Sequence, residues 1–528
     1  MTRRADRAAR PRKAPPARRP AASAIVWPGW LPPALAVAAA CAMRLWALRY
    51  QLYVTGDGTE YVLTAEALAH GRMYASIFPP GYPLLIALAH AFTPDRVRAA
   101  ALVSLVAGTL LPWPVWSLAR RALAPPWAFA AALLVALHPD LARFGAVSMS
   151  ESAYLLALYG ALALAAAERS LPAGLALGAA FSFRPDALVM APALAAWRIV
   201  RRPGAWRALL LGVAGFLVCA IPCWLWFHAL LGTWTLTPKL ADFFFTPPDW
   251  HLMEPRIHAG SLAAPGTWKT ITVAFAQYPA HAVALGRALL ECWPAPFLAL
   301  SLAALAFAPG WLVVIPLLHL LAVPLAGIPA QARFAFPALP SLGLLATVTV
   351  ATAWKRRGAW RLAALGIALA GMVWCGVGAA TRFVTPVDYW MESHKRAGLW
   401  LSAAAEPGAI VMDRKPFLAF YAERPYWVIP DEPYERLITE AVSHGARYLV
   451  VDQQIAEYYR PQLEPLLYDD AFRARESRLQ IVYVGGSGAG SGLFIFRILR
   501  PGEPRSSQPA FVELSYLREV QAARAASR

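Results

Sequence analysis

The sequence predicts a polytopic α-helical membrane protein with about eleven transmembrane helices and a small C-terminal α/β domain outside the membrane. Of its 528 residues, 58% are hydrophobic and only 15% are charged, whereas about a quarter of the residues of a soluble domain are charged. The chain also has many apolar runs near the ~20 residues that a helix needs to cross a bilayer. The high apolar content, with 34 Gly and 5 Cys, excludes disordered, collagen-like and disulfide-rich classes.

Apolar runs with few charges predict the individual transmembrane helices. Two of these runs, 171–183 and 186–200, are short for a full crossing and meet at Arg184-Pro185-Asp186. We therefore expect them to form a re-entrant pair buried against other helices. The predicted spans are 24–46, 99–119, 126–142, 152–167, 171–183, 186–200, 208–230, 290–308, 311–328, 335–353 and 362–381.

The formal net charge of +18 indicates how these helices are oriented. Lys and Arg gather in the segments on one side of the predicted spans, and short segments of this kind stay in the cytoplasm. The N-terminus is therefore predicted to be cytoplasmic. Because this charge faces anionic lipid headgroups, we expect membrane lipid and no nucleic acid as a partner. The segments predicted to lie outside are 51–98, 143–151, 231–289, 329–334 and everything after about residue 382.

Composition divides the chain into four parts. Residues 1–23 are rich in Arg, Pro and Ala and predict a disordered cytoplasmic tail, with a cleaved signal peptide as the alternative. Residues 24–381 form the transmembrane domain, 382–500 an extracytoplasmic α/β domain, and 501–528 a C-terminal tail. In the third part, sequence patterns predict strands at 409–413, 426–429 and 447–452, a hairpin at 479–484 with 493–498, and helices at 388–405 and 432–444.

The first outer loop carries the ionisable residues that are most informative. Asp57 stands between Gly56 and Gly58, directly after the first span, and Glu60 and Tyr61 follow within one helical turn. Glycine on both sides lets the backbone turn tightly and leaves the carboxylate open to a bulky ligand. A carboxylate held within reach of a hydroxyl or amine can act as a general base. The alternative is that Asp57 or Thr59 simply caps a helix.

Three further residues are candidates for the same outer face. Glu151 opens the span at 152–167, although Ser150 before it could be an ordinary helix cap. Arg184 and Arg333 each precede an apolar helix. An arginine at the membrane face needs an acidic side chain or a phosphate as a partner, and its planar fork suits a phosphate.

Five motifs in this order resemble the GT-C superfamily of polytopic glycosyltransferases. The resemblance is closest to the branch that contains protein O-mannosyltransferases, the lipid A aminoarabinose transferase and bacterial relatives of the RgtA/B/C/D type. It implies transfer of a sugar from a polyprenyl-phosphate donor to a cell-envelope glycan, lipid or protein on the outer side of the inner membrane. The motifs are GDGTEYVLTAEAL at 56–68, GRMYASIFPPGYPLLIAL at 71–88, SMSESAYLL at 148–156, SFRPDAL at 182–188 and ARFAFPALP at 332–340.

The resemblance also implies roles for individual residues. Asp57 matches the first-loop acid held to be the catalytic base, with Glu60 and Glu151 beside it. The implied substrate-binding residues are Tyr61, Arg72, Tyr82, Arg184 and Arg333.

This sequence departs from its relatives at two places. Gly58 and Thr59 separate the two acids that are adjacent in many relatives, and Phe78 stands where some have a lysine. The second departure shifts the expected phosphate contact to Arg72, Arg333 or the 231–289 loop.

The sequence leaves the cofactor and two other functions open. The five cysteines lack zinc spacing, but relatives differ in metal dependence, so a divalent metal stays possible. A polymerase or ligase of lipid-linked glycans would share the donor and the topology. A transporter or flippase is the alternative from another class; such proteins place charges near the membrane midplane and often contain inverted repeats.

Overall fold

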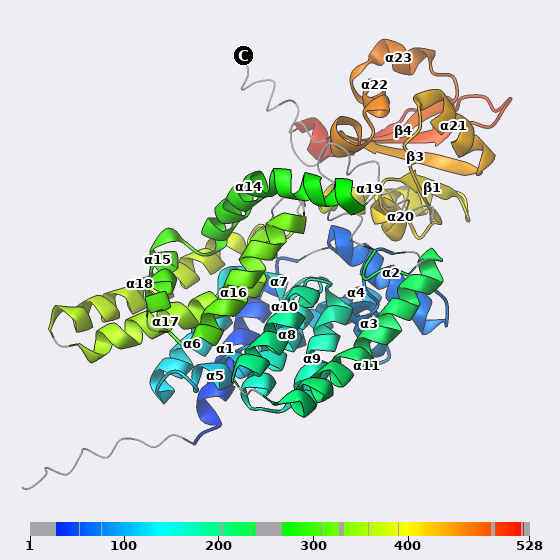
Figure 1. The fold of residues 1–528 in the computed structure, drawn as a ribbon. Helices are drawn as coiled ribbons and strands as arrows, with labels where there is room; N and C mark the ends of the chain where they lie inside the picture. The colour runs from blue at the N-terminus through cyan, green and yellow to red at the C-terminus, as the bar shows by residue number, and fades with distance from the viewer. Residues whose placement is uncertain are drawn as a thin grey trace, which may run out of the picture.

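The computed structural model describes residues 28–521 apart from 52, 75, 202–203, 233, 239–266, 307, 327–331, 357, 389, 487–491 and 519–520. A long helical body is joined at one end to a smaller unit that contains a β-sheet (Figure 1). The predicted tail 1–23 lies outside the described residues, as do residues 233 and 239–266 of the predicted 231–289 loop.

The helical body is built from Ala- and Leu-rich segments, several of which begin at proline. Proline lacks an N–H and has a helical φ, so it suits the first turn of a helix. The first half of the body contains α1 (Leu31–Leu48), α2 (Gly56–Ala69), α3 (Gly81–His90), α4 (Arg96–Leu110), α5 (Pro112–Ala119), α6 (Pro125–Leu137), α7 (Pro139–Phe144), α8 (Glu151–Ala166), α9 (Ser170–Phe183), α10 (Ala187–Arg201) and α11 (Trp206–Leu231). The second half contains α14 (Thr267–Cys292), α15 (Ala295–Ala303), η2 (Ala304–Ala306), α16 (Gly310–Ala322), η3 (Val323–Ala326), η4 (Ala332–Ala338), α17 (Leu339–Lys355) and α18 (Ala359–Arg382).

Several helices are long and apolar enough to cross a membrane. Within the described residues there are five, or six if one bent pair counts as a single span. The bent pair replaces the predicted continuous span 290–308: its two parts meet at 104° around Pro294, because proline cannot continue the hydrogen-bond pattern of a helix. The structure therefore confirms several membrane-length helices but not eleven. The five are Leu31–Leu48, Arg96–Ala119, Trp206–Leu231, Ala332–Lys355 and Ala359–Arg382.

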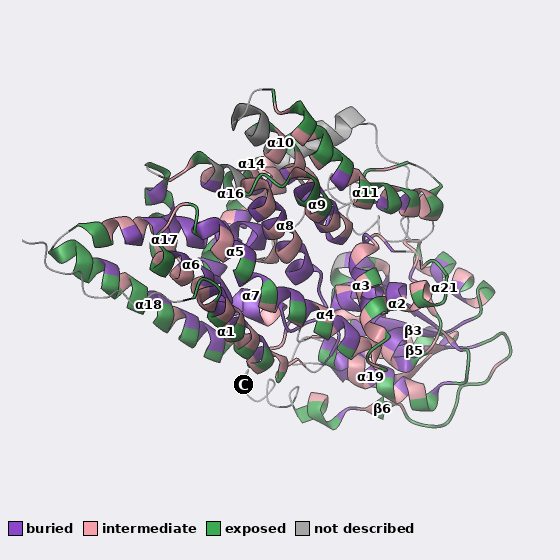
Figure 2. Cartoon of the chain, turned by 90° about the horizontal axis from the view of Figure 1, so that it is seen from below, coloured by how far each residue is buried: buried purple, intermediate pink, exposed green. Residues whose placement is uncertain are grey.

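The surfaces of the long helices suit a lipid environment. Large apolar side chains of α11 and α18 are exposed, among them Leu210, Val218, Leu362 and Val373. Figure 2 shows exposed residues along the outer side of α18, whereas α8 in the interior is mostly buried. Exposed apolar faces on long helices are expected where lipid, not water, is the neighbour.

The smaller unit is a six-stranded mixed sheet with helices on both faces. The strand order is β2-β1-β3-β5-β4-β6, and β1 is parallel to both β2 and β3. One core cluster contains residues of α21 and α22, and the other contains residues of α19 and α20. The strands are β1 (Ile410–Asp413), β2 (Tyr426–Val428), β3 (Ala446–Asp452), β4 (Leu479–Gly486), β5 (Gly492–Ile498) and β6 (Phe511–Val512). The helices are α19 (Met391–Ala404), α20 (Phe417–Ala422), α21 (Tyr434–Ser443), η5 (Ile455–Tyr459), η6 (Pro461–Leu463), α22 (Glu464–Tyr468) and α23 (Asp470–Arg475).

Hydrogen bonds fix this unit against the start of α2. The Val54 backbone N–H donates to the Tyr421 hydroxyl of α20 at 2.7 Å. In the segment between α18 and α19, the carbonyl oxygen of Pro386 accepts a hydrogen bond from Arg143 of α7 at 2.8 Å. As a result, the first turn of α2 lies where the helical body and the sheet unit meet.

Candidate active site

The first turn of α2 is packed very closely against the segment before α8. Thr55 is the N-cap residue, with an extended backbone, and Asp57 lies within the first turn. A Cβ atom on Gly58 would come within 2.2 Å of Ser148 Oγ and 2.8 Å of Ser148 O. A side chain at position 58 would clash with Ser148, so this close approach requires glycine. Because the N-cap residue is Thr55, the alternative that Asp57 or Thr59 caps the helix is wrong.

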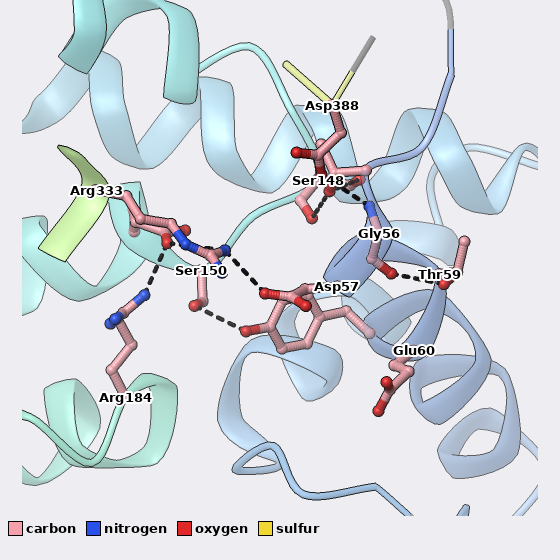
Figure 3. Close-up of polar contacts among 12 residues, drawn as sticks. Gly56, Asp57, Thr59, Glu60, Ser148, Ser150, Arg184, Arg333 and Asp388 are labelled. Carbon is pink, nitrogen blue, oxygen red and sulfur yellow. Dashed lines mark hydrogen bonds and ion pairs between the residues drawn. The ribbon is translucent and has the colours of Figure 1, made fainter. Parts of the chain in front are cut away.

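Asp57 stands between two cations from distant parts of the chain. Its Oδ2 accepts a hydrogen bond from Arg333 Nη1 at 2.8 Å, and its Oδ1 lies 3.4 Å from Lys415 Nζ. Figure 3 shows Arg333 reaching toward Asp57 from outside α2. The Asp57 side chain is 17% exposed, so it is largely shielded but still open to a ligand.

Glu60 and Tyr61 extend the site along α2. Glu60 is buried; its Oε2 accepts from Ser76 Oγ at 3.0 Å and its Oε1 lies 3.7 Å from Lys415 Nζ. The Tyr61 hydroxyl lies 3.1 Å from Ser150 Oγ. Ser150 is the N-cap residue of α8, as the capping alternative expects, but its side chain makes no cap bond to α8 and instead faces Tyr61 of α2.

A second group of charges lies next to the first. Arg184 Nη1 donates to Glu151 Oε1 at 2.7 Å, and its Nε donates to Asp186 Oδ2 at 3.1 Å. Arg333 Nη1 lies 3.9 Å from the same Glu151 oxygen, so Glu151 links the two arginines. The structure therefore brings together six of the predicted residues: Asp57, Glu60, Tyr61, Glu151, Arg184 and Arg333.

The segment after α18 contributes a further carboxylate. Asp388 Oδ2 accepts a hydrogen bond from the backbone N–H of Gly56 at 3.0 Å. Burial raises the pKa of the Asp388 carboxyl, and the nearby charge of Asp57 raises it further. This bond fixes the start of α2 to the chain that leads into the sheet unit.

Two predicted substrate-binding residues have other positions. Arg72 is an exposed residue that follows the end of α2. Among the contacts of the described residues, none joins Arg72 to the charged groups of the site. Tyr82 is buried; its hydroxyl lies 2.7 Å from Ser104 Oγ and donates to Ala100 O at 3.2 Å, while its ring packs edge-on against Tyr61. Tyr82 therefore supports Tyr61 and does not line the site itself.

The carboxylates of the site are paired with cations from the chain itself. Within the described residues, no three His, Cys, Asp or Glu side chains form a group that could hold a metal ion. Asp57, Glu60 and Glu151 each contact an arginine or a lysine instead.

A family model and two solved structures resemble the chain. Residues 78–226 match the model of the dolichyl-phosphate-mannose-protein mannosyltransferase family. ArnT from Cupriavidus metallidurans, solved with undecaprenyl phosphate bound, has a TM-score of 0.55 and 16% identity, covering 90% of this chain and 99% of that one. The Archaeoglobus fulgidus oligosaccharyltransferase, tethered to an acceptor peptide, has a TM-score of 0.56 and 12% identity, covering 90% and 75%. No curated protein sequence matches the chain significantly.

The chain has the GT-C glycosyltransferase fold. This finding confirms the resemblance that the sequence motifs indicated. The matched family segment includes Glu151 and Arg184, but it begins after Asp57 and ends before Arg333. The positions of Asp57 and Arg333 in the site therefore rest on the sequence motifs and the geometry, and not on the family-model match.

Sequence reasoning missed two members of the cluster, Lys415 and Asp388. Both come from the chain after the transmembrane helices, which gave no motif. One signal was available for Lys415: it follows a predicted strand at 409–413, and ligand-binding residues often lie just beyond the carboxyl ends of parallel strands.

Proposed function

We propose that this GT-C protein is a membrane glycosyltransferase that moves a sugar from a polyprenyl-phosphate donor to a cell-envelope acceptor on the outer side of the inner membrane. The observation that carries the proposal is the shielded carboxylate of Asp57, flanked by Arg333 and Lys415, with Arg184 close by. A base beside a group of phosphate-binding cations is what such a reaction needs. The bound undecaprenyl phosphate of the ArnT structure supports a lipid-linked donor of this class.

The geometry suggests how the bond changes are divided among the residues. Asp57 takes the proton from the acceptor hydroxyl or amine, and the acceptor atom then attacks the anomeric carbon of the donor sugar. The bond from that carbon to the phosphate oxygen breaks, and the sugar's configuration is inverted. Negative charge then grows on the leaving lipid phosphate, where Arg333 and Arg184 stabilise it.

Glu151, Glu60 and Tyr61 prepare the site for this step. Glu151 contacts both arginines, so it holds two guanidinium groups close together despite their like charge. Tyr61 spans from α2 to Ser150 at the start of α8. These contacts keep the phosphate-binding cations in place before the donor arrives, which lowers the cost of binding.

A cavity beside α2 has room for the acceptor. Its volume is about 930 Å³, and it is lined by α2, α3 and the start of α4 on one side and by α20 on the other. Its lining combines aromatic rings such as Phe420 with charged groups such as Glu66, and it includes Tyr74. Burial raises the pKa of the Tyr74 hydroxyl, and the negative charge of Glu60 raises it further.

The membrane orientation is part of the same proposal. The Lys- and Arg-rich segments between the spans place the N-terminus in the cytoplasm. The sheet unit and the Asp57 site are then extracytoplasmic, where polyprenyl-linked sugars meet envelope acceptors.

Replacement of the proposed base is the direct test. We expect Asp57→Asn to lower sugar transfer by at least about 100-fold, because loss of a general base typically costs 10²–10⁴-fold. Transfer is measured with the purified full-length protein, or as the mass of envelope glycans with and without the protein in cells. Asp470→Asn, on a 94% exposed side chain, is the control. Full activity of Asp57→Asn in a normally inserted protein would refute the assignment.

The same mass measurement separates the alternatives. A single added sugar supports the proposal, whereas addition of a whole chain identifies a polymerase or ligase. A transporter would not itself join a sugar to an acceptor. In a reconstituted system with donor and acceptor on the same side, the glycan masses of the acceptors would then be the same for the wild type and for Asp57→Asn. The charged cluster lies at the end of the helical body next to the sheet unit, away from the midplane position typical of transporters.

A further inference from the structure

Lys415 belongs to the sheet unit but reaches the site of the helical body. It follows β1, two residues after Asp413, yet its Nζ lies 3.4 Å from Asp57 Oδ1 and 3.7 Å from Glu60 Oε1. Its side chain is only 13% exposed. A lysine amine is rarely so shielded without a functional or pairing reason.

The backbone that carries Lys415 is held on both sides. The Arg414 N–H donates to Asp413 Oδ1 at 2.6 Å, and the Arg414 guanidinium carbon lies 3.8 Å from the centre of the Tyr459 ring. The Tyr426 hydroxyl donates to the carbonyl oxygen of Arg414 at 2.8 Å. The Lys415 carbonyl in turn accepts from the N–H of Phe417, in the first turn of α20. Contacts within the sheet unit therefore fix the backbone at Lys415.

The cations approach Asp57 from opposite sides. Arg333 contacts Oδ2 and Lys415 contacts Oδ1, so the space in front of this carboxylate has a positive group at each edge. Arg184 and Arg333 are each in contact with Glu151 as well. Lys415 is thus the cation that the sheet unit adds to a site whose other charges come from the helical body.

The lengths of the Lys415 contacts allow it to change partners. Both distances exceed the ~2.7–2.9 Å of a strong charged hydrogen bond, so a phosphate oxygen can offer the Lys415 amine a shorter contact than either carboxylate does. Lysine also has a flexible four-carbon stem and a compact charge. A donor phosphate that enters beside Asp57 could therefore attract the amine without any movement of the backbone.

We propose that Lys415 is a catalytic residue that leaves Asp57 and Glu60 to bind the phosphate of the polyprenyl donor. This inference rests on the proposed function. When the bond between the anomeric carbon and the phosphate oxygen breaks, the electron pair stays on that oxygen, and Lys415 and Arg333 stabilise the added charge. The proton from the acceptor goes to Asp57, which Lys415 has uncovered by moving to the phosphate.

Binding of undecaprenyl phosphate to the purified full-length protein in nanodiscs tests the proposal. Undecaprenol, which lacks the phosphate, is the neutral probe. We expect Lys415→Met to weaken undecaprenyl phosphate binding about tenfold or more, as for loss of a hydrogen bond to a charged group, without changing undecaprenol binding. Lys415→Arg should restore most of the loss. Lys395→Met, on α19 of the same unit, should bind as the wild type does.

The outcomes separate this inference from the proposed function. If the wild type itself does not prefer undecaprenyl phosphate to undecaprenol, both fail. If the wild type has this preference and Lys415→Met retains it in full, only the role of Lys415 is overturned; the lysine would then merely position Asp57. Should Lys415→Met not fold, acetylation of Lys415 in the wild type provides the test. Undecaprenyl phosphate should slow that reaction more than undecaprenol does, and equal rates would overturn the proposal.

Discussion

At the residue scale, buried charges are arranged around a few shared partners. Glu151 contacts Arg184 and Arg333, and Lys415 contacts Asp57 and Glu60. A buried charge without a partner costs several kcal/mol, so each of these groups depends on the others. Removal of one member should therefore change the site more than the loss of a single contact suggests.

A second buried group of charges lies behind Lys415. His394 Nε2 is 3.1 Å from Asp452 Oδ2, and Asp413 is buried beside them. Burial and the charge of Asp452 together raise the pKa of Asp413 to about 7, although His394 opposes the shift. Burial alone would lower the pKa of His394, but its contact with Asp452 raises it. The same contact with His394 lowers the pKa of Asp452 despite burial.

These shifts predict that the sheet unit loses stability as the pH rises from about 4 to about 7. The raised pKa of Asp413 means that the folded state binds its proton more tightly than the unfolded state, so stability falls as pH rises toward 7. The contribution of His394 has the same sign, because it is lost as pH rises through its raised pKa. We expect the Tm of the full-length protein to fall from pH 5 to pH 7 and Asp413→Asn to flatten this change. The exposed variant Asp470→Asn should keep the wild-type slope; an equal slope in Asp413→Asn would contradict the prediction.

At the element scale, close packing of α9 against α11 stabilises this part of the helical body. α9 and α11 approach each other through glycine: a Cβ atom on Gly178 would lie 2.5 Å from Phe216 O, and one on Gly174 would lie 1.9 Å from Gly212 O. Small residues allow such approach in membrane helices, where packing replaces the hydrophobic effect.

The α9–α11 contact predicts a specific loss of stability. We expect Gly178→Ala to lower the free energy of unfolding by about 1–3 kcal/mol, as overpacking does elsewhere. Gly160→Ala is the matched control, because a Cβ atom at that helical position meets nothing within 4 Å. The measurement is the Tm of the detergent-solubilised protein. Equal Tm values for the two variants would show that α9 and α11 are less closely packed than described.

Sequence patterns predicted helices and strands better than their junctions. The runs at 409–413 and 447–452 correspond to β1 and β3, and the acidic first loop leads to the site. The bend at Pro294 falls inside a predicted continuous span, because apolar content does not report where a helix changes direction. Lys415 and Asp388 could not be found by motif, since their relation to Asp57 depends on how the sheet unit docks onto α2.

At the scale of the whole molecule, the site is made by three regions. α2 provides Asp57, the start of η4 at the membrane-length helix Ala332–Lys355 provides Arg333, and the end of β1 provides Lys415. The family-model match covers none of these three residues. Function therefore depends on the arrangement of the regions as much as on any one of them.

Labelling of single cysteines tests the proposed orientation of these regions. In a variant without the five native cysteines, all of which are free thiols, Ser507→Cys in the sheet unit should react with a membrane-impermeant maleimide on intact spheroplasts. Arg356→Cys, between α17 and α18, should react only after the membrane is permeabilised, because Lys- and Arg-rich segments stay inside. The reverse pattern would place the Asp57 site in the cytoplasm and contradict the proposed function.

The position of Lys415 has a consequence for the synthesis of the protein. Asp57 emerges from the ribosome early, but the lysine beside it is made more than 350 residues later. By this arrangement, a chain whose C-terminal part has not yet docked onto α2 holds an incomplete site. A nascent or truncated copy would therefore lack the Lys415 amine beside Asp57, and the full set of charges would form only when assembly of the whole protein is finished.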